Sequence, residues 1–243
     1  MNISFAAEKI AGLPITNAAL TSIVGSLIII LLAVLLTKNL RTVPQKKQNF
    51  AEWLVEGFYN LVLGITGGDR QKATKIFPIG AAFFLFIIIN NWLGLVPGVG
   101  SIGVKEIIGS KEDFVPIFRG ANADLNMTLA LAVFSVGAIQ YYGISTLKLG
   151  YFKKFINFSS PIKFFVGALE SISEFAKIIS FSFRLFGNIF AGEVLLAVIT
   201  GLVPYIAPLP FYGLEMFVGL VQALVFAMLS LVFVSVAMQA EQH

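Results

Sequence analysis

Long uncharged apolar segments alternate with short charged connections along the chain. No charged side chain occurs in residues 10–37, between Lys75 and Lys105, or in residues 125–147. A bilayer core about 30 Å thick needs roughly 20 apolar residues for one helical span. The pattern therefore predicts an N-terminal span within residues 1–37, with its densest part at 20–36, and further spans at 77–96 and 125–147.

Two longer apolar segments follow, and both contain charged residues. Residues 211–240 contain Glu215, and residues 162–200 are interrupted by Glu170, Glu174, Lys177, Arg184 and Glu193. A helix over 162–200 would be about 58 Å long at a rise of 1.5 Å per residue. Because this is nearly twice the thickness of the hydrocarbon core, we expect the helix to be strongly tilted or broken.

A different pattern occupies residues 48–66. Three polar residues, Glu52, Glu56 and Asn60, lie opposite an apolar side formed by Phe50, Trp53, Leu54, Phe58, Leu61, Val62 and Ile65. This pattern is typical of an amphipathic helix that lies in the membrane interface. The segments together predict one all-α polytopic membrane domain over residues 1–243, with about five transmembrane helices and one interfacial helix. The last two transmembrane helices are expected to be long and strongly tilted.

Composition supports a membrane protein and excludes several kinds of chemistry. Hydrophobic residues make up 57% of the chain, charged residues make up 12%, and the mean hydropathy is +0.87, values far from those of a soluble domain. The absence of cysteine excludes disulfides and thiolate catalysis, and the single histidine is the last residue, His243. We expect no cofactor and no metal site. The net charge of +4 lies between apolar spans rather than on a polar domain, so no nucleic-acid partner is expected.

The connections predict the orientation in the membrane. Residues 38–47 and 148–163 hold eight basic residues and no acidic one, whereas residues 97–124 hold three basic and four acidic residues. Basic connections stay on the cytoplasmic side. Five spans then place the N-terminus outside and the C-terminus in the cytoplasm. We read no cleavable signal or transit peptide in the N-terminal residues, so we expect a bacterial plasma membrane.

Two sequence motifs bear on nucleotide binding. The stretch GVGSIG at 98–103 matches a dinucleotide-binding fingerprint, but it follows an apolar span rather than a strand, and we expect an ordinary loop. No phosphate-binding G-x-x-x-x-G-K-[ST] loop occurs in the chain, so it is not expected to bind or hydrolyse ATP itself.

Polar residues form defined faces on the last two predicted helices. Steps of four, three, four and four residues join Ser173, Lys177, Ser180, Arg184 and Asn188 into one stripe, because residues three and four apart share a helix face. Glu215, Gly219 and Gln222 form a second face with i, i+4, i+7 spacing. An ionisable residue inside the membrane costs about 2.5–3.5 kcal/mol on insertion scales, and such residues are functional by default.

The chemistry of these residues predicts a proton path in two parts. A guanidinium does not release its proton near neutral pH, so Arg184 can act only as a fixed charge that repels a passing cation. A buried carboxylate can exist in both protonation states. Glu193 and Glu215 would then serve an outer half-path, and Glu170, Ser173 and Ser180 an inner one, with Arg184 as the barrier between them.

Structural explanations compete with this one. Lys177 could extend its amine to the interface or pair with Glu170 or Glu174, Arg184 could form a structural ion pair, and Glu193 and Glu215 could join two helices by a hydrogen bond. Two other classes of protein also remain. A secondary transporter would carry repeats and broken helices around a substrate pocket, and a membrane anchor would tolerate neutral replacements at Arg184, Glu193 and Glu215.

The segment FRLFGNIFAGE at 183–193 resembles the signature of subunit a of the F-type ATP synthase. Three further segments resemble recurrent segments of that family in the same order: NWLGLVPG at 91–98, ADLNMTLALA at 123–132 and LVQALVFAMLSLVFVSVA at 220–237. The resemblance implies a helical membrane stator whose two long, tilted helices embrace a rotating ring of c subunits. The implied partners are this c-ring, the peripheral stalk subunit b, the rest of the F1F0 complex and the lipid bilayer.

The resemblance also implies roles for individual residues. Arg184 matches the essential arginine of the family, Asn188 its half-channel asparagine, and Gln222 the glutamine of the facing helix that supports the arginine. Glu193 and Glu215 match the outer-channel pair, where some relatives have a histidine at one position. Glu170 and Ser180 match positions near the inner channel.

Overall fold

Five of the helices in the computed structural model are long and apolar enough to span a membrane. The structure describes residues 16–38, 40–41, 46–96, 98–99, 102–108, 111–155 and 160–239. The five helices are α1 (Asn17–Thr37), α3 (Arg70–Gly94), α4 (Leu125–Leu147), α5 (Pro161–Leu202) and α6 (Pro208–Ala237). The polytopic helical fold expected from the sequence is confirmed. Residues 1–15 of the predicted first span and residue 240 of the last lie outside the described residues.

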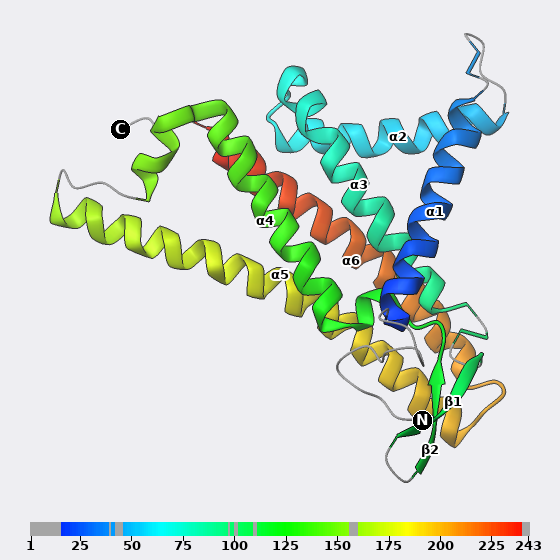
Figure 1. The fold of residues 1–243 in the computed structure, drawn as a ribbon. Helices are drawn as coiled ribbons and strands as arrows, with labels where there is room; N and C mark the ends of the chain where they lie inside the picture. The colour runs from blue at the N-terminus through cyan, green and yellow to red at the C-terminus, as the bar shows by residue number, and fades with distance from the viewer. Residues whose placement is uncertain are drawn as a thin grey trace.

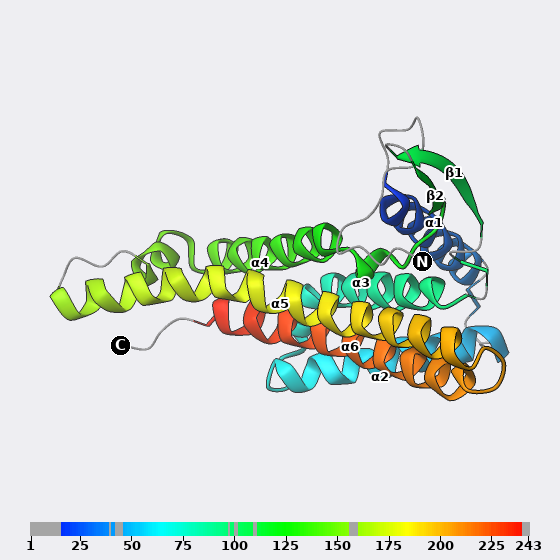
Figure 2. The ribbon, with the colours of Figure 1, turned by 90° about the horizontal axis from the view of Figure 1, so that it is seen from below.

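The longest helix, α5, was expected to be either strongly tilted or broken, and it is unbroken. α5 runs for 42 residues without interruption, which corresponds to about 63 Å at 1.5 Å per residue. It begins with a proline in its first turn, where the missing N–H costs nothing. Figure 2 shows α5 and α6 lying side by side, and Figure 1 shows both running obliquely to α1. A helix of this length fits a bilayer only at a steep tilt.

α2 (Lys46–Ile65) is the predicted amphipathic helix, and it lies across the ends of α1 and α3 in Figure 1. Its buried residues are Phe58 and Val62, and the Phe58 ring stacks on Phe84 of α3 with centroids 5.2 Å apart. Phe50, Trp53 and Leu54 are exposed. The outward side chains therefore form the apolar surface expected of a helix in the membrane interface.

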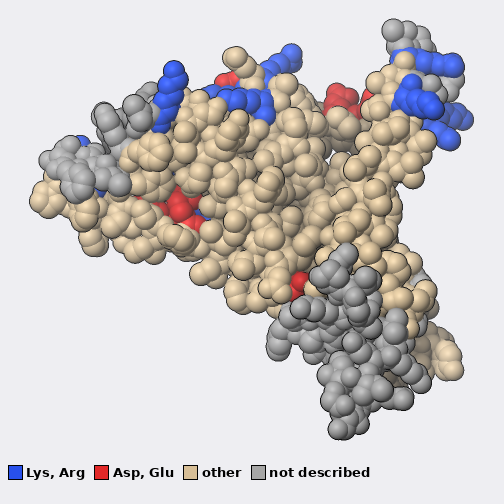
Figure 3. All heavy atoms as spheres, in the orientation of Figure 1, with Lys and Arg blue, Asp and Glu red and all other residues tan. Residues whose placement is uncertain are grey.

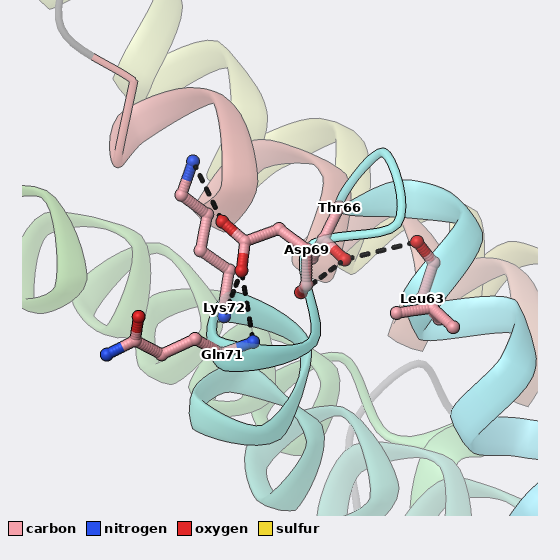
Figure 4. A network of polar contacts seen from close by, with 5 residues as sticks. All are labelled: Leu63, Thr66, Asp69, Gln71 and Lys72. Carbon is pink, nitrogen blue, oxygen red and sulfur yellow. Dashed lines mark hydrogen bonds and ion pairs between the residues drawn. The ribbon is translucent and has the colours of Figure 1, made fainter.

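A tight turn joins α2 to α3 (Figure 4). Gly67 and Gly68 have φ values of 65° and 86°, a conformation that other residues rarely adopt. Asp69 then caps α3, because its carboxylate accepts hydrogen bonds from the backbone N–H groups of Gln71 and Lys72. The backbone hydrogen bond from Lys72 lowers the pKa of Asp69. This cap explains why α3 begins at Arg70 rather than at the predicted residue 77.

The connection between α3 and α4 contains an element that the sequence analysis missed. Strands β1 (Gly103–Ile108) and β2 (Lys111–Pro116) form an antiparallel hairpin, at the opposite end of the molecule from α2 (Figure 1). Asn17 donates a hydrogen bond of 3.3 Å to the carbonyl of Pro116 and so ties the hairpin to α1. In the described part of the GVGSIG stretch, a turn lies at Gly98, as expected of a loop, but Gly103 is already the first residue of β1.

Small and hydroxyl side chains join the long helices. Asn91 of α3 donates to the carbonyl of Gly219 on α6 at 3.0 Å, and Ser135 and Ser230 link α4 to α6 at 2.7 Å. Thr128 and Ser182 link α4 to α5 at 3.2 Å. Polar contacts of this kind between close helices stabilise membrane bundles. They hold α5 and α6, which carry most of the candidate site, against α3 and α4.

Candidate functional site

Arg184 lies within α5 and is half-buried. Its Nη2 donates to Ser180 Oγ at 3.1 Å, one turn earlier, and Asn188 donates to the Arg184 carbonyl at 2.9 Å, one turn later. The guanidinium carbon is 5.9 Å from the centroid of the Phe181 ring. None of the ion pairs between described residues includes Arg184. Over this part of the chain, a structural ion pair therefore does not account for the charge.

The predicted polar stripe faces outward. Ser173, Ser180 and Asn188 are exposed, and Lys177 and Arg184 are half-buried. Large exposed apolar side chains accompany the stripe along α5, among them Ile172, Phe175, Ile179 and Phe183. The polar stripe therefore lies among exposed apolar side chains on one face of α5.

Four charged residues form a cluster toward the N-terminal end of α5, which we call the basic-end cluster: Lys154, Glu170, Glu174 and Lys177. Lys177 pairs with Glu174 at 2.7 Å, which confirms one of the predicted pairings, and its amine lies 4.7 Å from the Phe233 ring centroid. Glu170 instead pairs with Lys154 at 2.8 Å, because the short helix η2 (Lys148–Lys154) brings Lys154 to α5. The second oxygen of Glu174 is buried without a hydrogen-bond partner among the described residues.

The acidic residues of the basic-end cluster affect the pKa of Tyr151 in η2. Burial raises its pKa to about 12, and the negative charges of Glu174 and Glu170 contribute in the same direction. The phenol therefore stays protonated near neutral pH, and it donates to Gln140 Oε1 at 2.9 Å. Its ring packs against Gly143 of α4, where no side chain would fit. Tyr151 is thus a packing residue that fixes η2 on α4.

Three charged residues form a second cluster toward the C-terminal end of α5, which we call the hairpin-end cluster: Arg119, Glu193 and Glu215. Arg119 Nη2 lies 3.2 Å from Glu193 Oε2. Glu215 is buried, and a Cβ atom added at Gly192 would overlap its carboxylate. The two helices therefore approach closely at this point, and Glu215 reaches the residue that precedes Glu193. No hydrogen bond between Glu193 and Glu215 occurs among those described, since Glu193 is bonded to Arg119 instead.

Sequence reasoning missed Arg119 altogether. The residue lies in the connection from the hairpin to α4, which we assessed only by its balance of charges. Its pairing with Glu193 spans 74 residues, so no helical spacing relates the two positions. The one available signal was its place shortly before the ADLN segment.

Gln222 of α6 is half-buried. No hydrogen bond joins it to Arg184 among those recorded for the described residues, so its supporting role remains a prediction. Within the same part of the chain, no group of three His, Cys, Asp or Glu residues is arranged to hold a metal ion. The site is therefore built from separated carboxylates, from hydroxyl groups and from the Arg184 guanidinium, which has no ion-pair partner among the described residues.

Comparisons with known proteins place this arrangement in a family. The family model described as ATP synthase A chain matches residues 19–235. A protein of Desulfotalea psychrophila named ATP synthase subunit a is 37% identical over 84% of this chain and 76% of its own length. A protein of the same name from Campylobacter jejuni is 32% identical over 89% of this chain and 88% of its own length. One from Geotalea daltonii is 32% identical over 85% and 81%. The chain therefore belongs to the ATP synthase subunit a family.

Proposed function

We propose that this chain is the stator subunit of the F0 motor, and that it provides two offset half-channels for protons on either side of Arg184. One observation carries the proposal. A fixed cation without an ion-pair partner among the described residues lies on an exposed apolar face, between two separate clusters of carboxylates. The missing partner would be the ring carboxylate of a c subunit that passes the stripe on α5.

The residues divide the path into two parts. A proton enters from outside by Glu215, Glu193 and Asn188 and neutralises a ring carboxylate, which then rotates into the lipid. After nearly a full turn, the carboxylate meets Arg184 and loses the proton toward Ser180, Ser173 and Glu170. Each charge that moves across 100 mV yields about 2.3 kcal/mol, so several protons per turn supply the energy for ATP synthesis.

Arg184 performs two tasks in this scheme. Its permanent charge favours the ionised form of a ring carboxylate, and it repels a proton that would pass directly between the half-channels. The hydrogen bond to Ser180 keeps the guanidinium along the stripe, and we assign Gln222 of α6 to support it from the facing helix.

The positions of the basic side chains support one orientation of the chain in the membrane. Figure 3 shows Lys and Arg side chains along the end of the molecule where α2 and η2 lie. We place this end in the cytoplasm by the positive-inside rule, with the N-terminus outside and the C-terminus inside a plasma membrane. The c-ring would lie against the stripe, and the peripheral stalk subunit b and the rest of the F1F0 complex would complete the assembly.

The test replaces Arg184 in the complete complex. We expect Arg184→Ala to abolish coupled ATP synthesis and to raise passive proton flow through F0 in vesicles, because both functions require the charge. Arg70→Ala is the matched control, since Arg70 is an exposed arginine at the start of α3. Co-purification of the c-ring reports assembly. Coupled synthesis retained in Arg184→Ala would reject the assignment.

A secondary transporter is separated from this proposal by one further measurement. The purified chain alone, in liposomes, would then move a solute without any c-ring. We expect no such transport, because α5 is continuous and lacks the broken helices of such carriers.

A further inference from the structure

Four basic residues gather where α1 ends and α2 begins, and we call them the corner cluster: Lys38, Arg41, Lys46 and Lys47. All four are exposed, and Figure 3 shows Lys and Arg side chains at the corner of the molecule where these two helices meet. None of the ion pairs between described residues includes any of the four. The proposed proton path does not use them, so the corner cluster needs a separate explanation.

A side-chain bridge holds the two parts of the corner cluster together. Arg41 donates its backbone N–H to Gln48 Oε1 at 3.1 Å, and Gln48 Nε2 donates back to the Arg41 carbonyl at 2.9 Å. The same Nε2 atom donates to Glu52 Oε1 at 2.8 Å, so this exposed acid is bonded to an amide and forms none of the ion pairs between described residues. The backbone at Arg41 is therefore fixed beside the first turn of α2, which carries Lys46 and Lys47.

Two aromatic side chains follow the lysines on α2. The rings of Phe50 and Trp53 stack with centroids 6.1 Å apart and an interplanar angle of 29°, yet 62% and 67% of these residues remain exposed. Together with Lys46 and Asn49 they line an open groove. The groove thus combines an ammonium group and an amide with two apolar rings.

The last turns of α1 add an apolar surface to the same corner. Leu31, Leu35 and Leu36 of α1 are exposed, and so is Leu40, which follows the helix. Phenylalanine and tryptophan in a basic amphipathic helix insert at the level of the lipid headgroups. Exposed leucines beside these rings favour a lipid over an acidic protein segment as the occupant, because acyl chains cover such leucines.

We infer that the corner cluster is a docking site for the headgroup of an anionic phospholipid. Lys46 meets the lipid phosphate, the groove at Phe50 and Trp53 receives the glycerol region, and the acyl chains follow the exposed leucines of α1. Clusters of four or more Lys or Arg residues just beyond a membrane helix attract anionic lipids. A zwitterionic lipid offers the same phosphate but also carries a positive amine, so four cations without ion-pair partners in the described chain favour a lipid with a net negative charge. The site goes beyond the proposed function and does not depend on it.

The test uses the complete complex, reconstituted in phosphatidylcholine vesicles with a trace of a photoreactive lipid. The probe is either phosphatidylglycerol or phosphatidylcholine with the same photoreactive acyl chain, and mass spectrometry measures the lipid attached to residues 46–54. At trace amounts the labelling is proportional to affinity. Each basic residue near an anionic headgroup contributes about fivefold, so we expect phosphatidylglycerol to label these residues at least about thirtyfold more than phosphatidylcholine.

Three double variants separate the charge from the groove. Lys46→Gln/Lys47→Gln should lower phosphatidylglycerol labelling by about tenfold to thirtyfold, and Lys46→Arg/Lys47→Arg should retain it, because the charge is kept. Phe50→Ala/Trp53→Ala should lower the labelling by both lipids, because it removes the walls of the groove and leaves the cations in place.

The matched control is Arg70→Gln/Lys75→Gln. Both residues are exposed basic residues in the first turns of α3, so this variant removes the same charge away from the corner cluster, and the labelling of residues 46–54 should stay at the wild-type level. If Lys46→Gln/Lys47→Gln cannot be recovered as a complex, the wild type decides by its salt dependence. Raising the salt from about 0.1 M to about 1 M should lower labelling by phosphatidylglycerol and leave that by phosphatidylcholine unchanged.

Three results would overturn the inference. The first is equal labelling of the wild type by the two lipids. The second is loss of phosphatidylglycerol labelling when inorganic phosphate is added, since the site would then bind a free anion. The third is a wild-type corner that neither lipid labels and that crosslinks to another subunit, since a protein segment would then occupy it.

Discussion

The two charge clusters along α5 are built in opposite ways. In the basic-end cluster, Lys177 and Glu174 lie three residues apart on the same helix. In the hairpin-end cluster, Arg119 and Glu193 are 74 residues apart in the sequence, and Arg119 lies in the connection before α4. The short helix η1 (Ala121–Ala123) in this connection contacts α1, α3, α4 and α5. A flexible lysine can follow its partner or move to the interface, whereas an anchored guanidinium defines one geometry. The geometry of the ion pair in the hairpin-end cluster is therefore fixed by the connection before α4 and not by the spacing of residues on α5.

The largest difference between the two clusters is expected from a side chain added beside Glu215 at Gly192. Gly192→Ala would place a methyl group where the Glu215 carboxylate lies. Because that carboxylate ends a flexible side chain, the backbone can remain in place while the acid is displaced. A displacement of about 1 Å can lower a reaction rate by up to roughly a hundredfold, so we expect proton pumping to fall at least tenfold with normal c-ring content.

Gly201→Ala is the control for that substitution. A Cβ at Gly201, also on α5, would meet no atom within 4 Å, so pumping and assembly should equal those of the wild type. Unchanged pumping in Gly192→Ala would show that the position of the Glu215 carboxylate does not matter for proton transport. The hairpin-end cluster would then be no more sensitive to substitution than the basic-end cluster.

A smaller effect is expected from Lys177→Ala in the basic-end cluster. The variant removes the amine that pairs with Glu174 at 2.7 Å, but Lys177 is not among the groups that pass the proton in the proposed path, so we expect proton pumping to fall by less than about tenfold. Lys177→Arg should restore it, since the charge is kept. A loss as large as that expected for Gly192→Ala would contradict the contrast between the two clusters.

The smallest effect on transport is expected from Tyr151→Phe, next to the basic-end cluster. The variant loses the hydrogen bond to Gln140, worth about 0.5–1.5 kcal/mol, and pumping should not change. Folding holds the phenol protonated, since its pKa rises from 10.0 to about 12. The stabilisation from the neutral phenol is therefore complete below pH 10 and is lost as pH rises from 10 through 12.

Thermal melting of the purified complex between pH 8 and about pH 11 checks this sign. The wild type should lose stability in the alkaline part of this range, and Tyr151→Phe should lose less. Parallel melting curves for both proteins, or a change in pumping with Tyr151→Phe, would show that the residue acts differently.

The membrane helices could be predicted from local sequence patterns. Asp124 and Lys148 bound one apolar run, and α4 occupies the residues between them as predicted. The i, i+4 spacing of Ser180 and Arg184 correctly placed them on one face, where they form a hydrogen bond. Helix geometry makes such relations predictable, because every residue three or four positions away is a neighbour.

Contacts between segments that are far apart in the sequence could not be predicted in this way. The hairpin escaped notice because its strands are short and lie in a connection that we assessed by charge alone. The pairing of Glu170 with Lys154 was likewise missed, since it depends on the path of η2 back over α5. In each case, the partners are brought together by packing rather than by spacing.

The amino-acid sequence alone determined that this is a helical membrane protein with an arginine stripe on one long helix, because hydrophobicity and helical periodicity are local properties. Only the tertiary structure decided that Glu193 pairs with an arginine from a distant part of the chain. Glu193 is partly exposed and pairs with Arg119 from the connection before α4, whereas Glu215 is buried against Gly192 of α5. A salt bridge needs its nitrogen and oxygen atoms within about 4 Å of each other, so the three-dimensional path of the chain decides which residues pair.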